Sequence, residues 1–469
     1  MAIATVNPAT GETVETFEAH DNAEVARRIA EAADAAVTLR DTTFAQRAEW
    51  MNATADTVET DVERASRMLT LEMGKPIAQA RAEVLKCAKN MRFYARHAES
   101  FLADEPLDDP SAVSASQAWT VWQPLGVVLA VMPWNYPLWQ VIRFAAPALM
   151  AGNTGLLKHA SNVPQSALYL DTLFEKGGFP AGSFRTLLIG SAEVAAVIED
   201  SRVKAVTLTG SEPAGRSVAS TAAGQIKKAV LELGGSDPFI VLRDADLGAA
   251  AEKAARARFQ NAGQSCIAAK RFLVEAPVAA EFERRFADAI RALRVGDPLD
   301  PKTQVGPLAR EDLRDTLERQ VAVSVRMGAR VIVGGERRDG TGWFYEPTLL
   351  ADVTEEMPVL NEETFGPVAA LLAVRDADEA VRVANRSPYG LGAAIWTKDE
   401  TAARALARRI ESGSVFINGM VASDPRLPFG GVKKSGYGRE LSSFGIREFV
   451  NIQTIWIGPA TQPPVVNAE

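Results

Sequence analysis

The feature that most constrains the fold of this chain is a regular alternation of short apolar runs with helical stretches. Apolar runs lie at residues 126–132, 155–158 and 204–209, and helical periodicity occupies 136–150 and 163–175 between them. Parallel strands require this pattern, because the chain must return across the sheet, usually through a helix, before the next strand begins. We therefore predict parallel βαβ units in this part of the chain.

A second series of the same kind begins near Gly234 and continues to about residue 396. Before the first series, residues 22–103 have mostly helical periodicity, with a break at Gly74-Lys75-Pro76. Strand-like segments near residues 119 and 452 belong to neither series. The sequence predicts an α/β fold of two doubly wound domains in series, with these two strand segments left over.

The charge balance and hydropathy exclude several classes of protein. The 469 residues include 51 Lys and Arg against 59 Asp and Glu, a net charge of −8, whereas non-specific nucleic-acid binding needs a basic surface. The longest apolar run ends at Pro133, too short for a membrane span, and the first 13 residues lack the basic and apolar regions of a secretory signal. We expect a cytoplasmic protein with neither a nucleic-acid nor a membrane partner.

The chain has two cysteines and three histidines, all far apart in sequence. This composition excludes a disulfide scaffold and most His/Cys metal sites, so no metal is expected, and it argues against a Ser-His-Asp mechanism. The motifs of P-loop enzymes and of α/β-hydrolases are missing. Gly436-Tyr437-Gly438 does not complete the usual dinucleotide-binding fingerprint, so a cofactor site would need another architecture.

Cys266 ends the polar stretch Asn-Ala-Gly-Gln-Ser-Cys, whereas Cys87 lies among apolar residues of a helical stretch and reads as a core thiol. On this pattern alone, Cys266 is either a nucleophile or an ordinary buried thiol. A nucleophile here must be activated, because a free thiol is only a few per cent thiolate near neutral pH.

Three further segments have the residue types of a reaction site. Glu232 lies among apolar residues beside two glycines, where burial would raise its pKa and suit it to general-base work; pairing with Lys227 or Lys228 is the alternative. Asn135 follows a buried strand and is either an oxyanion donor or a turn residue. Gly210 and Ser211 lie between a strand and a helix, which is either an anion site or a plain turn.

Taken in order, these segments resemble the aldehyde dehydrogenase superfamily. The resemblance extends from Val6 to about Ile452. It is carried by Pro-Trp-Asn at 133–135, Lys-x-x-Ser at 158–161, Thr-Gly-Ser-x-x-x-Gly at 209–215, Glu-Leu-Gly-Gly at 232–235, Gly-Gln-Ser-Cys at 263–266 and Glu-Glu-Thr-Phe-Gly-Pro-Val at 362–368.

The resemblance implies a role for each matching residue. Cys266 is the implied nucleophile, Glu232 the general base, and Asn135 with the backbone N–H of Cys266 the oxyanion hole. The implied cofactor site consists of Trp134, Lys158, Ser161, Gly210, Ser211, Glu363 and Phe365. A dehydrogenase that hydrolyses its acyl-enzyme is favoured over a CoA-acylating or acyl-phosphate-forming relative because Glu232 is present, and over an inactive binding protein because the three catalytic residues are present together.

The family's fold implies how the chain divides. Residues 1–110 and 125–233 would form the cofactor-binding domain and residues 234–437 the catalytic domain. Residues 111–124 and 438–469 would form a bridging arm that adds to the sheet of a neighbouring subunit. The resemblance therefore implies a homodimer or homotetramer.

Two departures within the family indicate the cofactor and the substrate. Ser161 stands where NAD-selective members place a Glu that repels a 2′-phosphate, so NADP is the expected cofactor and NAD the weaker alternative. Arg143, eight residues after Asn135, and Ser423 offer partners for a substrate carboxylate. This pair is similar to that of bacterial succinate-semialdehyde dehydrogenases; glutarate semialdehyde, an uncharged aldehyde, or a purely structural salt bridge at Arg143 are the alternatives.

Overall fold

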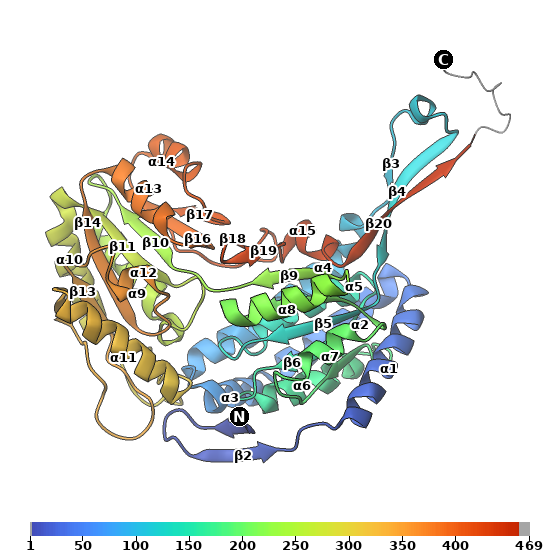
Figure 1. Cartoon of the computed structure of the whole chain (residues 1–469), viewed down its shortest axis with the longest axis horizontal. Coiled ribbons are helices and arrows are strands. Elements are labelled where there is room, and N and C mark those ends of the chain that lie inside the picture. The colour runs from blue at the N-terminus through green and yellow to red at the C-terminus, as the bar shows by residue number, and fades with distance from the viewer. Residues whose placement is uncertain (1, 459–469) are drawn as a thin grey trace.

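Two twisted parallel sheets, each covered by helices on both faces, form the two lobes of the computed structural model, which describes residues 2–458 (Figure 1). The sheet of the first lobe has the order β19-β9-β8-β5-β6-β7. Its strands are β5 (Val127–Met132), β6 (Thr154–His159), β7 (Phe184–Thr186), β8 (Val203–Thr209), β9 (Lys228–Glu232) and the antiparallel edge strand β19 (Gly436–Tyr437). The strand order reverses between β5 and β8, and ligands of open α/β sheets bind beyond the carboxyl ends at such a point.

Helices on opposite faces of this sheet belong to different hydrophobic clusters. One face is covered by α1 (Asn22–Arg40), α7 (Val194–Glu199) and α8 (Glu212–Gly224). The other carries α5 (Trp139–Met150) and α6 (Pro164–Lys176), with α2 (Phe44–Thr60), α3 (Val62–Met73) and α4 (Ile77–Phe101) packed around them. The hairpin of β1 (Ile3–Val6) and β2 (Thr13–Phe17) lies beside α3 and α6.

The helical segment of residues 22–103 is divided into four helices, at the predicted break and at two further places, residues 41–43 and residue 61. Asp21 caps α1 by accepting a hydrogen bond from the Glu24 N–H (2.8 Å), and Thr43 and Gln46 form a capping box at α2. Gly74 ends α3 with φ +77°, a conformation that glycine adopts without strain, and Pro76 precedes α4. The predicted break at Gly74-Lys75-Pro76 is confirmed.

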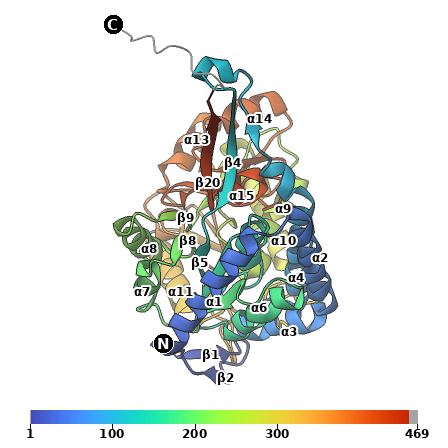
Figure 2. The same cartoon turned by 90° about the vertical axis from the view of Figure 1, so that its right-hand side faces the viewer.

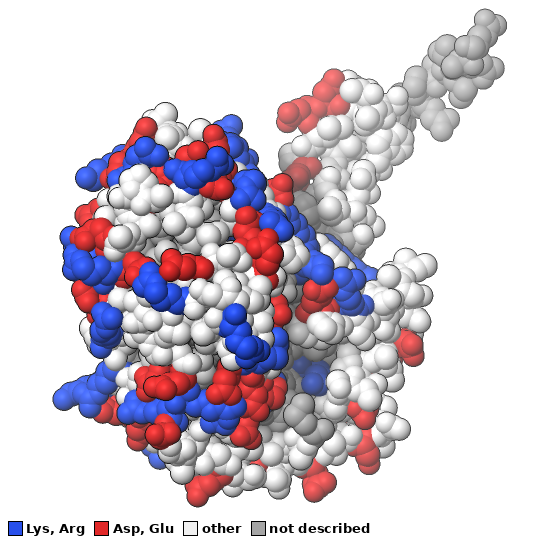
Figure 3. All heavy atoms as spheres, turned by 60° about the vertical axis from the view of Figure 1, so that its left-hand side comes forward, with Lys and Arg blue, Asp and Glu red and all other residues white. Residues whose placement is uncertain are grey.

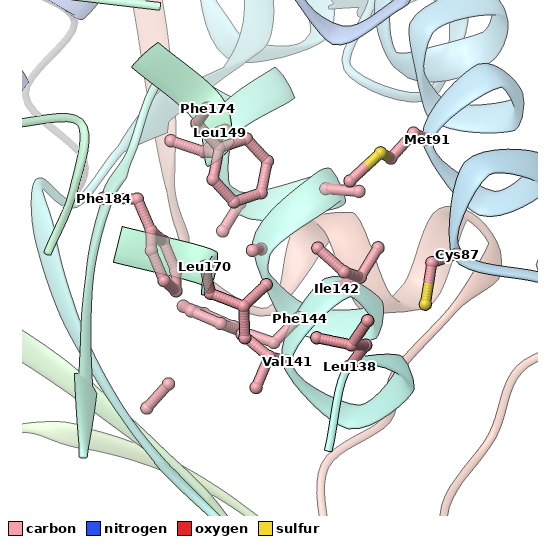
Figure 4. Close-up of a cluster of buried hydrophobic side chains, with 14 of the residues drawn as sticks. Cys87, Met91, Leu138, Val141, Ile142, Phe144, Leu149, Leu170, Phe174 and Phe184 are labelled. Atoms are coloured by element: carbon pink, nitrogen blue, oxygen red, sulfur yellow. The ribbon is translucent and has the colours of Figure 1, made fainter. Parts of the chain in front are cut away.

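Helix α5 is buried on all sides, and this determines where the polar groups of the site can lie. Its apolar residues pack against α4, α6 and β7, and Cys87 lies in this cluster as a core thiol, as predicted (Figure 4). Two polar side chains of α5, Gln140 and Arg143, are nevertheless 2 % exposed. A buried guanidinium needs charged or hydrogen-bonding partners, so Arg143 marks a polar site inside the lobe.

The second lobe contains the seven-stranded sheet β12-β13-β14-β11-β10-β16-β17. Its strands are β10 (Asp237–Val241), β11 (Ala269–Glu275), β13 (Thr348–Ala351), β14 (Val368–Val374), β16 (Gly392–Trp396) and β17 (Ser414–Ile417), all parallel, and the antiparallel β12 (Arg330–Val333). Alternate residues of β10 face different cores: Phe239 packs toward α9 (Leu247–Phe259) and α10 (Ala276–Arg291), and Ile240 toward α13 (Ala377–Arg386) and α14 (Glu400–Ala407).

The remaining elements complete the second lobe and its junction with the first. They are η2 (Gln260–Gly263), α11 (Glu311–Arg326), α12 (Pro358–Asn361), the paired β15 (Tyr389–Gly390) and β18 (Val432–Lys433), and α15 (Ser442–Arg447). The α/β class with two doubly wound lobes is confirmed.

A three-stranded antiparallel arm projects from the first lobe (Figures 1 and 2). It contains β3 (Glu105–Pro106), β4 (Gln117–Pro124) and β20 (Val450–Ile457), with η1 (Pro110–Val113) between the first two. The two strand segments that belonged to neither series thus pair with each other. The predicted domain boundaries stay a prediction. In the structure β3, from the predicted cofactor-binding segment, joins the arm, and β19, from the predicted catalytic segment, joins the first sheet. The end of the predicted arm, 459–469, lies outside the described residues.

The face of the molecule in Figure 3 carries acidic and basic side chains in alternation over the second lobe. Ion pairs of the second lobe include Arg382–Glu355 and Arg330–Glu283. Across residues 2–458, no helix combines the length and apolarity needed to cross a membrane. The same part of the chain has no cluster of three or more metal-binding side chains.

Candidate active site

A pocket lies where α4 and α5 of the first lobe meet the Cys266 loop and the loop around Ser423. The side chains that line it include Lys86, Trp139, Gln140, Arg143, Cys266, Ser423 and Phe429. Three residues predicted from widely separated segments, Cys266, Arg143 and Ser423, therefore share one cavity.

The Cys266 loop is held in an unusual backbone conformation. Asn261, Ala262 and Gly263 have φ values of +56°, +53° and +73°, and two of them are not glycine. A Cβ at Gly263 would lie 2.3 Å from the Gly366 carbonyl oxygen, and one at Gly235 would lie 2.5 Å from that of Cys266. Glycine is thus required in both motifs because other backbone passes close by.

A buried lysine fixes the end of this loop. Lys270, with no exposed surface, donates from Nζ to the carbonyl oxygens of Ser265 (3.0 Å) and Cys266 (2.9 Å). The Cys266 side chain is partly exposed to the pocket, unlike that of Cys87. Burial raises the pKa of the Cys266 thiol to about 12, against the opposing effect of Arg143 and Lys270, so the resting thiol is protonated and needs a base.

Glu232 ends β9 and is 2 % exposed. Within residues 2–458 neither carboxylate oxygen has a hydrogen-bond partner, and Lys228, one of the alternative partners, pairs with Glu448 instead. Burial first, and then the charge of Glu440, hold the pKa of Glu232 well above its ordinary value. A buried carboxylate without partners and with a raised pKa has the properties of a general base.

Asn135 is fixed in place by hydrogen bonds of its backbone carbonyl and its side-chain amide. Its carbonyl oxygen accepts from Asn261 Nδ2 (2.9 Å) and Lys75 Nζ (3.0 Å), while its Nδ2 donates one hydrogen bond to the Gln264 carbonyl (3.0 Å). The second N–H of this amide has no acceptor in the described chain, nor does the backbone N–H of Cys266. Two unused donors, one of them on Cys266 itself, suit the oxyanion hole that the resemblance implies.

Arg143 already has a partner. Its Nε forms a buried ion pair with Glu440, its guanidinium lies 4.5 Å from the ring centroid of Phe429, and Nη2 is 3.4 Å from Thr209 Oγ1. Arg143 therefore lines the pocket as predicted, and it also forms the salt bridge that was the alternative.

Sequence reasoning missed Lys86. Its Nζ donates to Ser423 Oγ (2.6 Å) and lies 3.9 Å from the Trp139 ring centroid. Lys86 precedes Cys87 in a helical stretch whose apolar pattern indicates only core packing, and it belongs to none of the motifs that suggest a reaction site. Only its contact in the folded protein with Ser423, 337 residues further along the chain, indicates a role for it.

The predicted cofactor residues lie around the carboxyl ends of the strands. Ser211 is the N-cap residue of α8, and its side chain makes no cap hydrogen bond, so the first N–H groups of the helix receive none from it. Glu363 accepts from the Gly235 N–H (3.0 Å), and the rings of Trp134 and Phe365 meet edge to face at 5.7 Å. These groups fit the dinucleotide that the resemblance implies.

Lys158 and Ser161 lie at and just after the end of β6. Burial lowers the pKa of Lys158, and the nearby charge of Glu193 partly offsets this effect. No carboxylate stands at position 161 to repel a phosphate on the adenosine ribose.

The two α/β lobes and the pocket with its cysteine fit a dehydrogenase. The chain belongs to the aldehyde dehydrogenase family, whose model matches residues 1–455. The predicted family is confirmed. The chain is 58% identical over 457 residues to succinate-semialdehyde dehydrogenase [NADP(+)] 1 of Mycobacterium tuberculosis, covering 97% of this chain and 100% of the relative. It is 56% identical to succinate-semialdehyde dehydrogenase [NADP(+)] of Mycobacterium avium, covering 98% and 97%.

A solved structure of succinic semialdehyde dehydrogenase from Streptococcus pyogenes, in complex with NADP+, superposes with a TM-score of 0.94 at 38% identity. The superposition covers 97% of this chain and 100% of that one.

Proposed function

We propose that this protein is an NADP+-dependent succinate-semialdehyde dehydrogenase that uses Cys266 as nucleophile. The main support is the pocket that is lined both by the Cys266 thiol and by the cationic and hydroxyl groups of Arg143, Lys86 and Ser423. An ω-carboxyaldehyde is complementary to both kinds of group, since it presents a carbonyl to the thiol and a carboxylate to the cations. The relatives with 56–58% identity carry the same substrate and cofactor in their names.

In the first step, Cys266 adds to the aldehyde carbon, and its proton passes to Glu232, whose raised pKa makes it able to accept. The free N–H of Asn135 and that of Cys266 donate to the new oxyanion. One such preorganised donor is worth about 2.7–4 kcal/mol.

When bound, NADP+ supplies a hydride acceptor, so that the carbon held by Cys266 is oxidised to a thioester. After Glu232 has released its first proton to solvent, it takes one from water, which attacks the thioester carbon and releases succinate. The sulfur regains a proton as it leaves, so the thiol is restored. Water is the acyl acceptor in this scheme, without CoA or phosphate.

Ser161 and Lys158 support NADP+ as the preferred cofactor, with NAD+ accepted more weakly. We propose that Trp134, Phe365 and Glu363 border the nicotinamide end, and that Gly210 and Ser211 bind the pyrophosphate.

We also propose a homodimer or homotetramer assembled through the arm. Ile452, Trp456 and Ile457 of β20 are 63%, 51% and 45% exposed, and apolar strands this exposed are usually covered by another chain. A cytoplasmic location is consistent with two free cysteines.

The test is a panel of succinate semialdehyde, glutarate semialdehyde and butyraldehyde with NADP+ or NAD+, without CoA or phosphate. We expect the highest kcat/KM with succinate semialdehyde and NADP+. A preference for butyraldehyde or glutarate semialdehyde would contradict the substrate, and a requirement for CoA or phosphate would contradict hydrolysis. No turnover of any aldehyde would support an inactive binding protein.

A further inference from the structure

We propose that Lys86 of α4 is a specificity-determining residue that binds the distal carboxylate of the substrate together with the hydroxyl of Ser423. The inference rests on the proposed function, because it assigns a partner to the carboxylate of the semialdehyde. The observation behind it is the position of the Lys86 ammonium in the pocket of Cys266, beside Ser423 Oγ at 2.6 Å.

The charge of Lys86 is not paired within the described chain. No carboxylate lies within ion-pair distance of its Nζ, whose close neighbours are a hydroxyl and the face of Trp139. Two acidic residues, Glu83 and Asp424, act on its charge, but both have other partners. Glu83 pairs with Lys75 and accepts the N–H groups of Leu138 and Trp139, and Asp424 pairs with Arg426 at 2.7 Å.

Arg143 differs from Lys86 in this respect. Its guanidinium already has a counter-ion, because it faces the Glu440 carboxylate in a buried ion pair. Lys86 is then the cation whose charge a substrate carboxylate can neutralise, and Arg143 can add N–H donors.

The energetic state of Lys86 agrees with this role. Burial lowers the pKa of Lys86 to about 8, and the positive charge of Arg143 acts in the same direction. A partly buried ammonium without a counter-ion is destabilised, and an incoming carboxylate relieves that destabilisation. The ring of Trp139 contacts Lys86 Nζ with its face, and this cation–π contact orients the Lys86 side chain toward the pocket.

The first variant is Lys86→Met, which keeps the length of the side chain and removes the charge. We expect kcat/KM for succinate semialdehyde to fall by about 30-fold or more, mainly through KM, because a buried charge pair is lost. The rate with butyraldehyde should change by less than ~3-fold, since this aldehyde has no carboxylate. Succinate, used as an inhibitor of butyraldehyde oxidation, should bind correspondingly more weakly.

The matched control is Lys89→Met, one turn along α4 at an exposed position, which should leave both aldehydes and succinate inhibition unchanged. Lys86→Arg should retain most of the preference. If Lys86→Met does not fold, Lys86→Gln repeats the test with a donor for Ser423 retained.

Equal losses for both aldehydes, or unaltered succinate inhibition, would overturn the assignment of Lys86. These results are distinct from a failure of the proposed function, which the unmodified enzyme reveals by showing no preference for succinate semialdehyde over butyraldehyde.

Discussion

The guanidinium of Arg143, which lines the same pocket as the Cys266 thiol, is paired with the buried carboxylate of Glu440. This relationship changes what removal of the arginine should do. The positive charge of Arg143 lowers the pKa of both Cys266 and Glu232, against the effect of burial, so it acts on the catalytic groups as well as on a substrate carboxylate.

Arg143→Ala should therefore reduce kcat/KM for butyraldehyde as well as for succinate semialdehyde. Glu440 would be left buried and unpaired, and the pKa of Glu232 would rise further. Because Glu232 must be deprotonated to act as a base, the acidic limb of the pH–rate profile should move to higher pH. The measurement is kcat/KM for butyraldehyde against pH; an unshifted limb with a loss confined to the semialdehyde would assign Arg143 to the substrate alone.

Cys266→Ala should abolish oxidation while NADP+ binding, followed by nucleotide fluorescence quenching or calorimetry, persists. Cys87→Ala is the matched control, since it removes the other thiol from a core position and should leave turnover intact. Oxidants should inactivate the enzyme at Cys266 itself, because its sequence neighbours offer no second cysteine. A Cys266–Cys87 disulfide in oxidised protein would contradict this expectation.

Glu232→Gln should remove steady-state turnover because no base remains to activate water. At neutral pH the burst of NADPH should also be slow, since the thiol has a pKa of about 12 and loses its proton acceptor. Raising the pH should restore the burst and not the steady state. Rapid-mixing absorbance measurements separate the two phases, and a full burst at neutral pH would limit Glu232 to the hydrolytic step.

Lys75→Met should lower both stability and kcat. Lys75 is 1 % exposed, pairs with Glu83 and donates to the Asn135 carbonyl (3.0 Å). Removing one partner of a buried pair typically costs about 3–5 kcal/mol, and Asn135 loses a positioning contact. Thermal unfolding and steady-state kinetics test this; Lys75→Met/Glu83→Gln should recover stability without recovering kcat. An unchanged kcat in either variant would show that this contact does not position Asn135.

Ser161→Glu should convert the cofactor preference. A carboxylate at this position would repel the 2′-phosphate and raise KM for NADP+ by at least about tenfold, since ~1.4 kcal/mol of repulsion has that effect. KM for NAD+ should stay similar or improve. Ser161→Gln, of the same length without charge, is the control, and an equal loss in that variant would indicate steric rather than electrostatic exclusion.

The order of elements and the chemistry-bearing motifs could be predicted from the sequence because they depend on local properties. The periodicity of apolar residues and the break at Gly74 each depend on residues only a few positions apart. The motifs around Cys266, Glu232 and Asn135 are also local. Their glycines are required by close backbone contacts that the structure places at Gly235 and Gly263.

The tertiary structure alone decided the partners of the charged groups. Arg143 and Ser423 could be predicted as a pair for a carboxylate, but Glu440 and Lys86 were found only once α4, α5 and the loops near 423 and 440 were brought together. The reason is physical. Whether a buried charge is satisfied depends on which side chains lie within a few ångströms of it in space, and residues 86 and 423 are separated by 337 positions along the chain. No local pattern contains that information.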